Sequence, residues 1–231
     1  MLLQLFINIF VILCLSDLHL GSPICQAELT LKILEETDYD KLIICGDILD
    51  SYNIHRLCKK QWKVLSALRK ISKNKECIFI KGNHDKGLDM ISTLLGFDFK
   101  MEHIEVIGNK KFYFVHGDRW DYIIQLKPLL TEIASGLYYL LQKVDKRQKY
   151  TRILKKKIKS WHGAAKKISE RICKHAHNNG YDTVVFGHTH IPLYDIFHGV
   201  KCVNLGSQCD LPVTYGLIDE KGHISLKSID S

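Results

Sequence analysis

The stretch VILCLSDLH at residues 11–19 decides the fold class, because five apolar residues run directly into Asp17, Leu18 and His19. A short apolar run that ends in polar residues is typical of a buried strand followed by a loop. We expect this first strand to cover about residues 9–15. Similar apolar runs recur at Leu42–Cys45, Cys77–Ile80, Phe112–Val115 and Thr183–Phe186.

Longer amphipathic segments separate these runs. Residues 28–37 and 57–72 have helical spacing, and Trp62, Leu65 and Leu68 fall on one face of the second segment. Strands that alternate with helices predict an α/β fold. The C-terminal part alternates more like antiparallel strands, at Val200–Leu205, Thr214–Asp219 and Ile224–Ile229.

The whole chain of 231 residues fits a single domain, residues 1–231, of ordinary soluble composition, with 46% hydrophobic and 25% charged residues. The eight cysteines show no C-x-x-C spacing, which favours a reducing compartment over a disulfide framework or a zinc knuckle. The apolar run at residues 2–15 lacks a basic flank and is shorter than the ~20 residues of a membrane span. We therefore expect a cytoplasmic protein in which residues 1–8 are a short extension or reflect a misassigned start. A membrane-associated N-terminus is the alternative.

Residues 121–178 differ from the rest of the chain. Leu126, Leu130 and Leu137 belong to one apolar stripe of helical period and Trp161 to a second, so we expect two helices inserted between strands. The segment carries 14 Lys and Arg against 4 Asp and Glu, a net charge of +10, whereas the whole chain carries +8. The remainder is thus slightly acidic. Such stripes and charges are common in packed, solvated helices, but they also suit a basic surface for an anionic membrane or nucleic acid.

Five polar clusters each follow a predicted buried strand. In open α/β sheets, ligands gather beyond the carboxyl ends of the strands, where these loops would converge. Any one cluster alone is typical of a turn or a helix cap, but five together would be an unlikely coincidence. They contain Asp17 and His19; Asp47; Asn83, His84 and Asp85; His116; and His188 and His190.

The chemistry of these side chains predicts a site for two divalent metal ions. Imidazole mixed with carboxylate and amide oxygen, without thiolate, suits Mn²⁺, Fe²⁺, Zn²⁺ or Co²⁺, and we expect Mn²⁺. Paired ions ~3.5–4 Å apart stabilise both the attacking and the leaving oxygen of a displacement at phosphorus. Asp47 is our candidate for the bridging carboxylate, because the preceding Gly46 lets the chain turn tightly.

These motifs resemble those of the calcineurin-like metallophosphoesterases: D-x-H at Asp17 and His19, then GDILD, GNHD, His116 and GHTH, spanning residues 17–190. The resemblance implies a two-sheet α/β sandwich with a helical insertion. It implies that His84 steadies the phosphoryl group or protonates the leaving oxygen, and that Asp85 orients His84. One ion would take Asp17, His19, Asp47 and His190, and the other Asp47, Asn83, His116 and His188.

Within that family the chain is most similar to the UDP-2,3-diacylglucosamine diphosphatase branch, in its length, in HGD after the fourth strand and in the insertion before GHTH. Those enzymes cleave a UDP-linked acylated sugar in lipid A synthesis. The resemblance implies a lid whose apolar face, including Leu126, Leu130, Leu137 and Trp161, receives acyl chains at the inner face of the membrane. His84 stands where the best-known members have Arg. The alternatives are a nuclease or nucleotide phosphodiesterase on the same metal centre and, more remotely, a non-catalytic scaffold.

Overall fold

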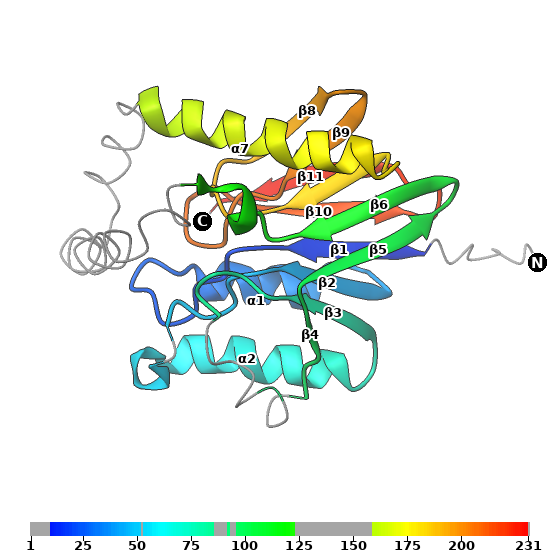
Figure 1. The fold of residues 1–231 in the computed structure, drawn as a ribbon. Helices are drawn as coiled ribbons and strands as arrows, with labels where there is room; N and C mark the ends of the chain where they lie inside the picture. The colour runs from blue at the N-terminus through cyan, green and yellow to red at the C-terminus, as the bar shows by residue number, and fades with distance from the viewer. Residues whose placement is uncertain (1–9, 52, 86–91, 93–95, 123–158, 231) are drawn as a thin grey trace, which may run out of the picture.

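A computed structural model describes residues 10–51, 53–85, 92, 96–122 and 159–230. It shows two β-sheets packed face to face, with helices on both outer sides (Figure 1). The expected two-sheet α/β sandwich is confirmed. The strand order is β11-β10-β1-β2-β3-β4 in the first sheet and β5-β6-β7-β9-β8 in the second.

The first sheet is built on parallel strands. These are β1 (Val11–Leu15), β2 (Lys41–Cys45), β3 (Glu76–Ile80) and the short β4 (Phe99–Lys100). The C-terminal β10 (Val213–Asp219) pairs antiparallel with β1, and β11 (Ile224–Ile229) pairs antiparallel with β10. The second and third strands match the predicted runs to within one residue, whereas β1 begins two residues later than the expected start at residue 9.

The second sheet has a parallel centre and antiparallel edges. Its centre contains β6 (Lys110–Val115), β7 (Thr183–Phe186) and β9 (Val200–Asn204), and its edges are β5 (Glu102–Ile107) and β8 (Leu193–Phe197). The antiparallel expectation for the C-terminal part is thus right for β10 and β11. It is only partly right for β9, which pairs parallel with β7 and antiparallel with β8.

Among the residues that the structure describes, three long helices cover the sandwich. The helices α1 (Ala27–Glu36) and α2 (Lys59–Ser72) lie against the first sheet, and α7 (Lys159–Asn178) lies against the second (Figure 1). Helix α2 buries Val64, Leu65 and Leu68, whereas Trp62, which the helical spacing puts on the same side as Leu65 and Leu68, is 44% exposed. Two 3-10 turns, η1 (Ile54–Arg56) and η2 (Asp118–Trp120), lie in the loops that follow β2 and β6.

The two sheets are held together by an apolar layer and, at one end, by an ion pair. Side chains such as Ile12, Ile43 and Phe114 fill the space between the sheets and are fully buried. At the start of β2, the buried Lys41 ammonium lies 2.7 Å from a Glu105 carboxylate oxygen on β5 of the other sheet. The polar loops that follow β1, β2 and β3 emerge at the opposite end.

Part of the segment 121–178 can be placed. Ala165, Ile168 and Ile172 on α7 are buried, and the last two pack with the second sheet, so this stretch of the apolar stripe is core. Leu126, Leu130 and Leu137 lie outside the described residues, as does the side chain of Trp161. Their lid role and the extent of the insertion therefore stay predictions. Within the described part of the chain, no helix has both the length and the apolarity that crossing a membrane requires.

Candidate metal centre

The predicted site residues come together at one end of the sandwich. Asp17, Asp47 and Asn83 follow β1, β2 and β3 of the first sheet, while His116 and His188 follow β6 and β7 of the second. The carboxyl ends of these parallel strands meet at the seam between the sheets. Both sheets therefore contribute side chains to one cluster.

Backbone strain is concentrated at the candidate ligands. Six non-glycine residues in the described part of the chain have positive φ, and five of them are candidate ligands: Asp17 at 52°, His19 at 42°, Asp47 at 52°, His188 at 68° and His190 at 58°. This conformation is disfavoured for residues with a Cβ and persists only where the surroundings impose it. The fold thus holds the donor side chains in place at a cost in conformational energy.

Three glycines make room for this cluster. A Cβ at Gly46 would lie 2.3 Å from His116 Nδ1, one at Gly82 would lie 2.1 Å from Asp47 Oδ1, and one at Gly187 would lie 2.1 Å from Asp17 Oδ2. Each glycine precedes one candidate ligand and admits the side chain of another. The expectation for Gly46 was a tight turn; its φ of 89° agrees, and the close approach of His116 is a second reason for glycine.

The first donor group contains Asp17, His19 and His190, whose nearest donor atoms all lie within 4.8 Å of one another. His19 Nε2 and His190 Nε2 are 3.0 Å apart, and Asp17 Oδ1 lies 3.3 Å from His190 Nε2. Two nitrogens that bind one ion at ~2.1 Å and at right angles are about 3.0 Å apart. The spacing therefore fits a shared metal ion.

The second donor group contains Asp17, Asp47 and His116. His116 Nε2 lies 3.3 Å from Asp47 Oδ2 and 3.2 Å from Asn83 Oδ1. His188 belongs to neither group, but its ring centroid is 5.1 Å from that of His116. The structure thus brings Asp47, Asn83 and His116 together and leaves His188 at the margin.

Each of the two aspartates accepts a backbone amide and also faces the imidazoles. Asp47 Oδ1 accepts a hydrogen bond from the His84 amide at 2.9 Å, while Asp47 Oδ2 lies 3.3 Å from His116 Nε2 and 3.6 Å from His19 Nε2. The His188 amide donates to both oxygens of Asp17, to Oδ2 at 2.9 Å and to Oδ1 at 3.2 Å, and Asp17 Oδ1 also lies 3.3 Å from His190 Nε2. Asp47 Oδ2 therefore lies near one nitrogen of each donor group, so this carboxylate could serve ions held at both.

The buried aspartates and histidines stabilise one another's charged forms. Burial would raise the pKa of Asp47, but the imidazoles of His116 and His84 outweigh burial and hold this pKa below its usual range. Burial likewise opposes charge on His116, yet the carboxylates of Asp47 and Asp17 raise its pKa to about 10. Without a metal ion the cluster therefore holds protons that a divalent cation would displace.

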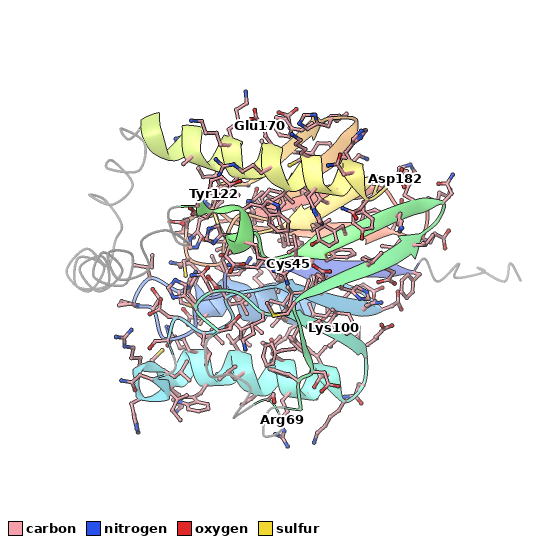
Figure 2. All side chains as sticks on the ribbon, viewed as in Figure 1. Cys45, Arg69, Lys100, Tyr122, Glu170 and Asp182 are labelled. Atoms are coloured by element: carbon pink, nitrogen blue, oxygen red, sulfur yellow. The ribbon has the colours of Figure 1, made fainter. Side chains whose placement is uncertain are left out.

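The far ring nitrogens of the histidines also have partners. His190 Nδ1 lies 3.2 Å from Asp210 Oδ2, and His188 Nε2 lies 3.1 Å from Asp121 Oδ2. His116 Nδ1 lies 2.8 Å from the carbonyl oxygen of Cys45, a residue labelled at the centre of the sandwich in Figure 2. A carbonyl can only accept, so His116 donates from Nδ1 and presents Nε2 to the cluster. Such partners fix the orientation of metal-binding histidines.

Asp50 is a further partner that the sequence interpretation did not single out. It is the second aspartate of GDILD, its Oδ1 lies 3.5 Å from His19 Nδ1, and its Oδ2 accepts from Arg56 at 3.2 Å. His19 Nδ1 is buried and makes no closer hydrogen bond. The GDILD motif could have identified Asp50, because this residue is its second aspartate. Asp121 and Asp210 had no comparable signal, because neither lies in a motif of the family pattern.

The expected contact between Asp85 and His84 is corrected by the structure. Asp85 is fully buried, and its two oxygens accept from the amides of Leu49 at 3.1 Å and Gly82 at 3.0 Å. Burial and the charge of Asp47 raise the pKa of Asp85 to about 7. His84 Nδ1 instead lies 2.9 Å from the Asp50 carbonyl oxygen. The Asp85 side chain therefore points into the protein, where it joins the loop after β2, through Leu49, to the loop after β3, through Gly82.

The donor set and its spacing define a centre suited to divalent cations, of the kind that serves hydrolysis of phosphate esters. The calcineurin-like phosphoesterase family matches the sequence over residues 10–192, and the chain belongs to this family. It is thus a metallophosphoesterase-type, metal-dependent hydrolase, and its family is dinuclear. Among curated proteins, none matches the chain.

Solved structures share the fold. An archaeal phosphodiesterase is 17% identical with a TM-score of 0.56, over 95% of this chain and 100% of its own. The phosphoesterase Yfce from E. coli is 16% identical with a TM-score of 0.52, over 96% of this chain and 100% of its own. A hypothetical protein from Pyrococcus horikoshii is 14% identical with a TM-score of 0.55, over 96% of this chain and 88% of its own. At these identities the likeness shows the fold alone.

Proposed function

We propose that the chain hydrolyses a phosphate ester or anhydride with two divalent cations, Mn²⁺ by preference, at this centre. The observation that carries the proposal is the position of Asp47 Oδ2 between His116 Nε2 and His19 Nε2, at 3.3 and 3.6 Å. One ion would be held by Asp17, His19, Asp47 and His190, and the other by Asp47, Asn83, His116 and His188. Bound there, such ions polarise the phosphoryl group and stabilise the attacking and leaving oxygens.

His84 is our candidate for the catalytic side chain that acts on substrate. Its Nδ1 faces the Asp50 carbonyl at 2.9 Å and must donate to it, which leaves Nε2 for the substrate. Its ring lies edge-on to that of His19, with centroids 4.8 Å apart. From this place a protonated His84 would donate to a phosphoryl oxygen or to the leaving oxygen. Asp85 would support this role only through the loop it anchors.

For the substrate we propose the pyrophosphate of a UDP-linked acylated sugar, with the inserted helices near an anionic membrane surface. This substrate proposal is supported by the resemblance of the motifs to those of UDP-2,3-diacylglucosamine diphosphatases and by the basic charge of residues 121–178. On α7, Lys166, Lys167 and Lys174 are exposed. A nuclease or nucleotide phosphodiesterase remains the second candidate, since basic charge also suits nucleic acid. A non-catalytic scaffold is the third, and it is disfavoured because every residue of the proposed ligand sets is present.

One panel of substrates tests these proposals. Mn²⁺-loaded protein is assayed against UDP-diacylglucosamine, cyclic nucleotides, oligonucleotides and bis(p-nitrophenyl) phosphate, with Asp47→Ala as the inactive control. Turnover of the lipid substrate well above the others supports the lipid proposal. Faster turnover of oligonucleotides or cyclic nucleotides supports the second candidate. Metal-loaded protein without activity on any of the four would contradict the hydrolytic proposal.

A further inference from the structure

A pocket of about 350 Å³ lies between the end of η2 and helix α7. Figure 2 shows Tyr122, one of its lining residues, beside η2 and beneath α7. Its wall combines two cationic side chains, one carboxylate, an aromatic ring and a small apolar floor. The lining residues are Asp121, Tyr122, Gly163, Ala164, Lys167, Ile168 and Arg171.

The pocket adjoins the metal centre through one side chain. Asp121 lines the pocket, and its Oδ2 lies 3.1 Å from His188 Nε2. His188 in turn packs edge-on against His116, with ring centroids 5.1 Å apart. A substrate whose scissile phosphorus lies at the centre could therefore extend a neighbouring group into this pocket.

The pocket presents positive charge. The Asp121 carboxylate is engaged with His188, whereas Lys167 has no ionic partner among the residues that the structure describes. Arg171 is held in place: Nη1 donates to the Trp120 carbonyl at 3.0 Å, and the guanidinium lies 3.9 Å from the centroid of the Tyr122 ring. A fixed guanidinium loses little conformational freedom when it binds an anion, and its fork matches phosphate geometry.

The floor of the pocket adds room for a larger group. Gly163 has no atom within 4 Å of the place where a Cβ would stand, and Ala164 is also small. A purely structural role, in which Arg171 ties α7 to η2, accounts for the contact with Trp120. It does not account for Lys167, or for an open space beside both cations.

We propose that this pocket binds a second phosphate of the substrate, next to the scissile one. The proposal rests on the phosphoesterase function proposed above and narrows the substrate class to phosphoanhydrides and to esters that carry another phosphate. Lys167 and Arg171 bind the second phosphate, and the group attached to it lies over Gly163 and Ala164.

The test is a binding measurement that does not depend on turnover. Titration calorimetry on Mn²⁺-loaded protein compares UDP, in its non-hydrolysable α,β-methylene form with two phosphates, and UMP, with one. Lys167→Gln should weaken UDP binding about fivefold or more and leave UMP binding unchanged, because a charge-assisted hydrogen bond to the second phosphate is lost. Lys166→Gln is the matched control, since Lys166 is the exposed neighbour outside the pocket. Arg171→Gln should act like Lys167→Gln.

Equal affinities for UDP in Lys167→Gln, Lys166→Gln and the unmodified protein would overturn the proposal. So would an equal loss for UDP and UMP, because the pocket would then not distinguish the second phosphate. Hydrolysis of bis(p-nitrophenyl) phosphate is measured on the same samples and should stay within about twofold in the control variant Lys166→Gln, which lies outside the pocket. Absence of that hydrolysis in the unmodified protein would instead refute the proposed function, while the calorimetry would still decide whether the pocket binds phosphate.

Discussion

Replacing Gly187 by alanine should damage both the fold and the metal centre. The new Cβ would lie 2.1 Å from Asp17 Oδ2, 2.6 Å from Ser16 Cβ and 2.7 Å from Ser16 Oγ, whereas ordinary contact begins near 3.4 Å. The Asp17 carboxylate would have to move by more than about 1 Å, and the buried Ser16, which the new Cβ would also meet, would have to move as well. Overpacking of this kind costs about 1–3 kcal/mol.

The displacement would also separate Asp17 Oδ1 from His190 Nε2, now 3.3 Å apart. For a chain of this length, 1–3 kcal/mol corresponds to a fall of roughly 2–12 °C in unfolding temperature. Scanning calorimetry of the metal-free and Mn²⁺-loaded protein measures this fall and the stabilisation by metal together. Gly163→Ala is the control, because its Cβ would meet nothing within 4 Å; it should raise stability by about 0.5–1 kcal/mol as a helix substitution. A Gly187→Ala protein that melts like the unmodified one and binds two Mn²⁺ ions equally well would refute this reasoning.

Four other predictions concern the centre directly. Asp47→Ala should lose metal at both positions, and two tightly bound ions found in that variant by metal analysis would rule out a bridge. His84→Ala should keep its metal content and lose about 10²–10⁴ in turnover, as expected for a general acid or base; metal loss would mean that it is a ligand. Asp210→Asn should weaken Mn²⁺ binding about 10- to 100-fold in calorimetry, whereas Asp195→Asn on the exposed β8 should not. Neighbouring carboxylates raise the pKa of His116 to about 10, so Mn²⁺ affinity should rise with pH below that value. Calorimetry in buffers of different ionisation enthalpy should detect the protons that are released on binding. A pH-independent affinity would contradict the charge assigned to His116.

The sequence predicts the central strands well, because each is an unbroken apolar run buried on both faces. The edge strands β5 and β8 escaped prediction. In β5 exposure alternates along the strand, but the apolar Ile104 and Val106 occupy exposed positions, so hydropathy does not follow burial. In β8 three consecutive residues, including Tyr194 and Ile196, are exposed. Which strands share a sheet was also beyond the sequence. The C-terminal β10 pairs with β1 from the other end of the chain, a choice made by long-range packing.

The candidate ligands could be predicted because each stands beside a glycine or at a strand end in a recognisable motif. Their supporting groups could not. Asp121 and Asp210 meet His188 and His190 only because loops from different parts of the chain converge. Asp85 shows the opposite error: the family resemblance implied that it orients His84, but its buried carboxylate accepts instead from the amides of Leu49 and Gly82.

The position of the centre at the seam between the sheets links metal binding to folding. Each proposed ligand set draws side chains from both sheets, so bound ions would cross-link the two halves of the sandwich. A cation at 100 times its dissociation constant would stabilise the native state by about 2.7 kcal/mol, and a chelator would remove that stabilisation. The Lys41–Glu105 ion pair joins the sheets at the opposite end and does not depend on metal. Chelation should therefore loosen the sandwich first at its loop end, where amide hydrogen exchange would report separation of the sheets before global unfolding.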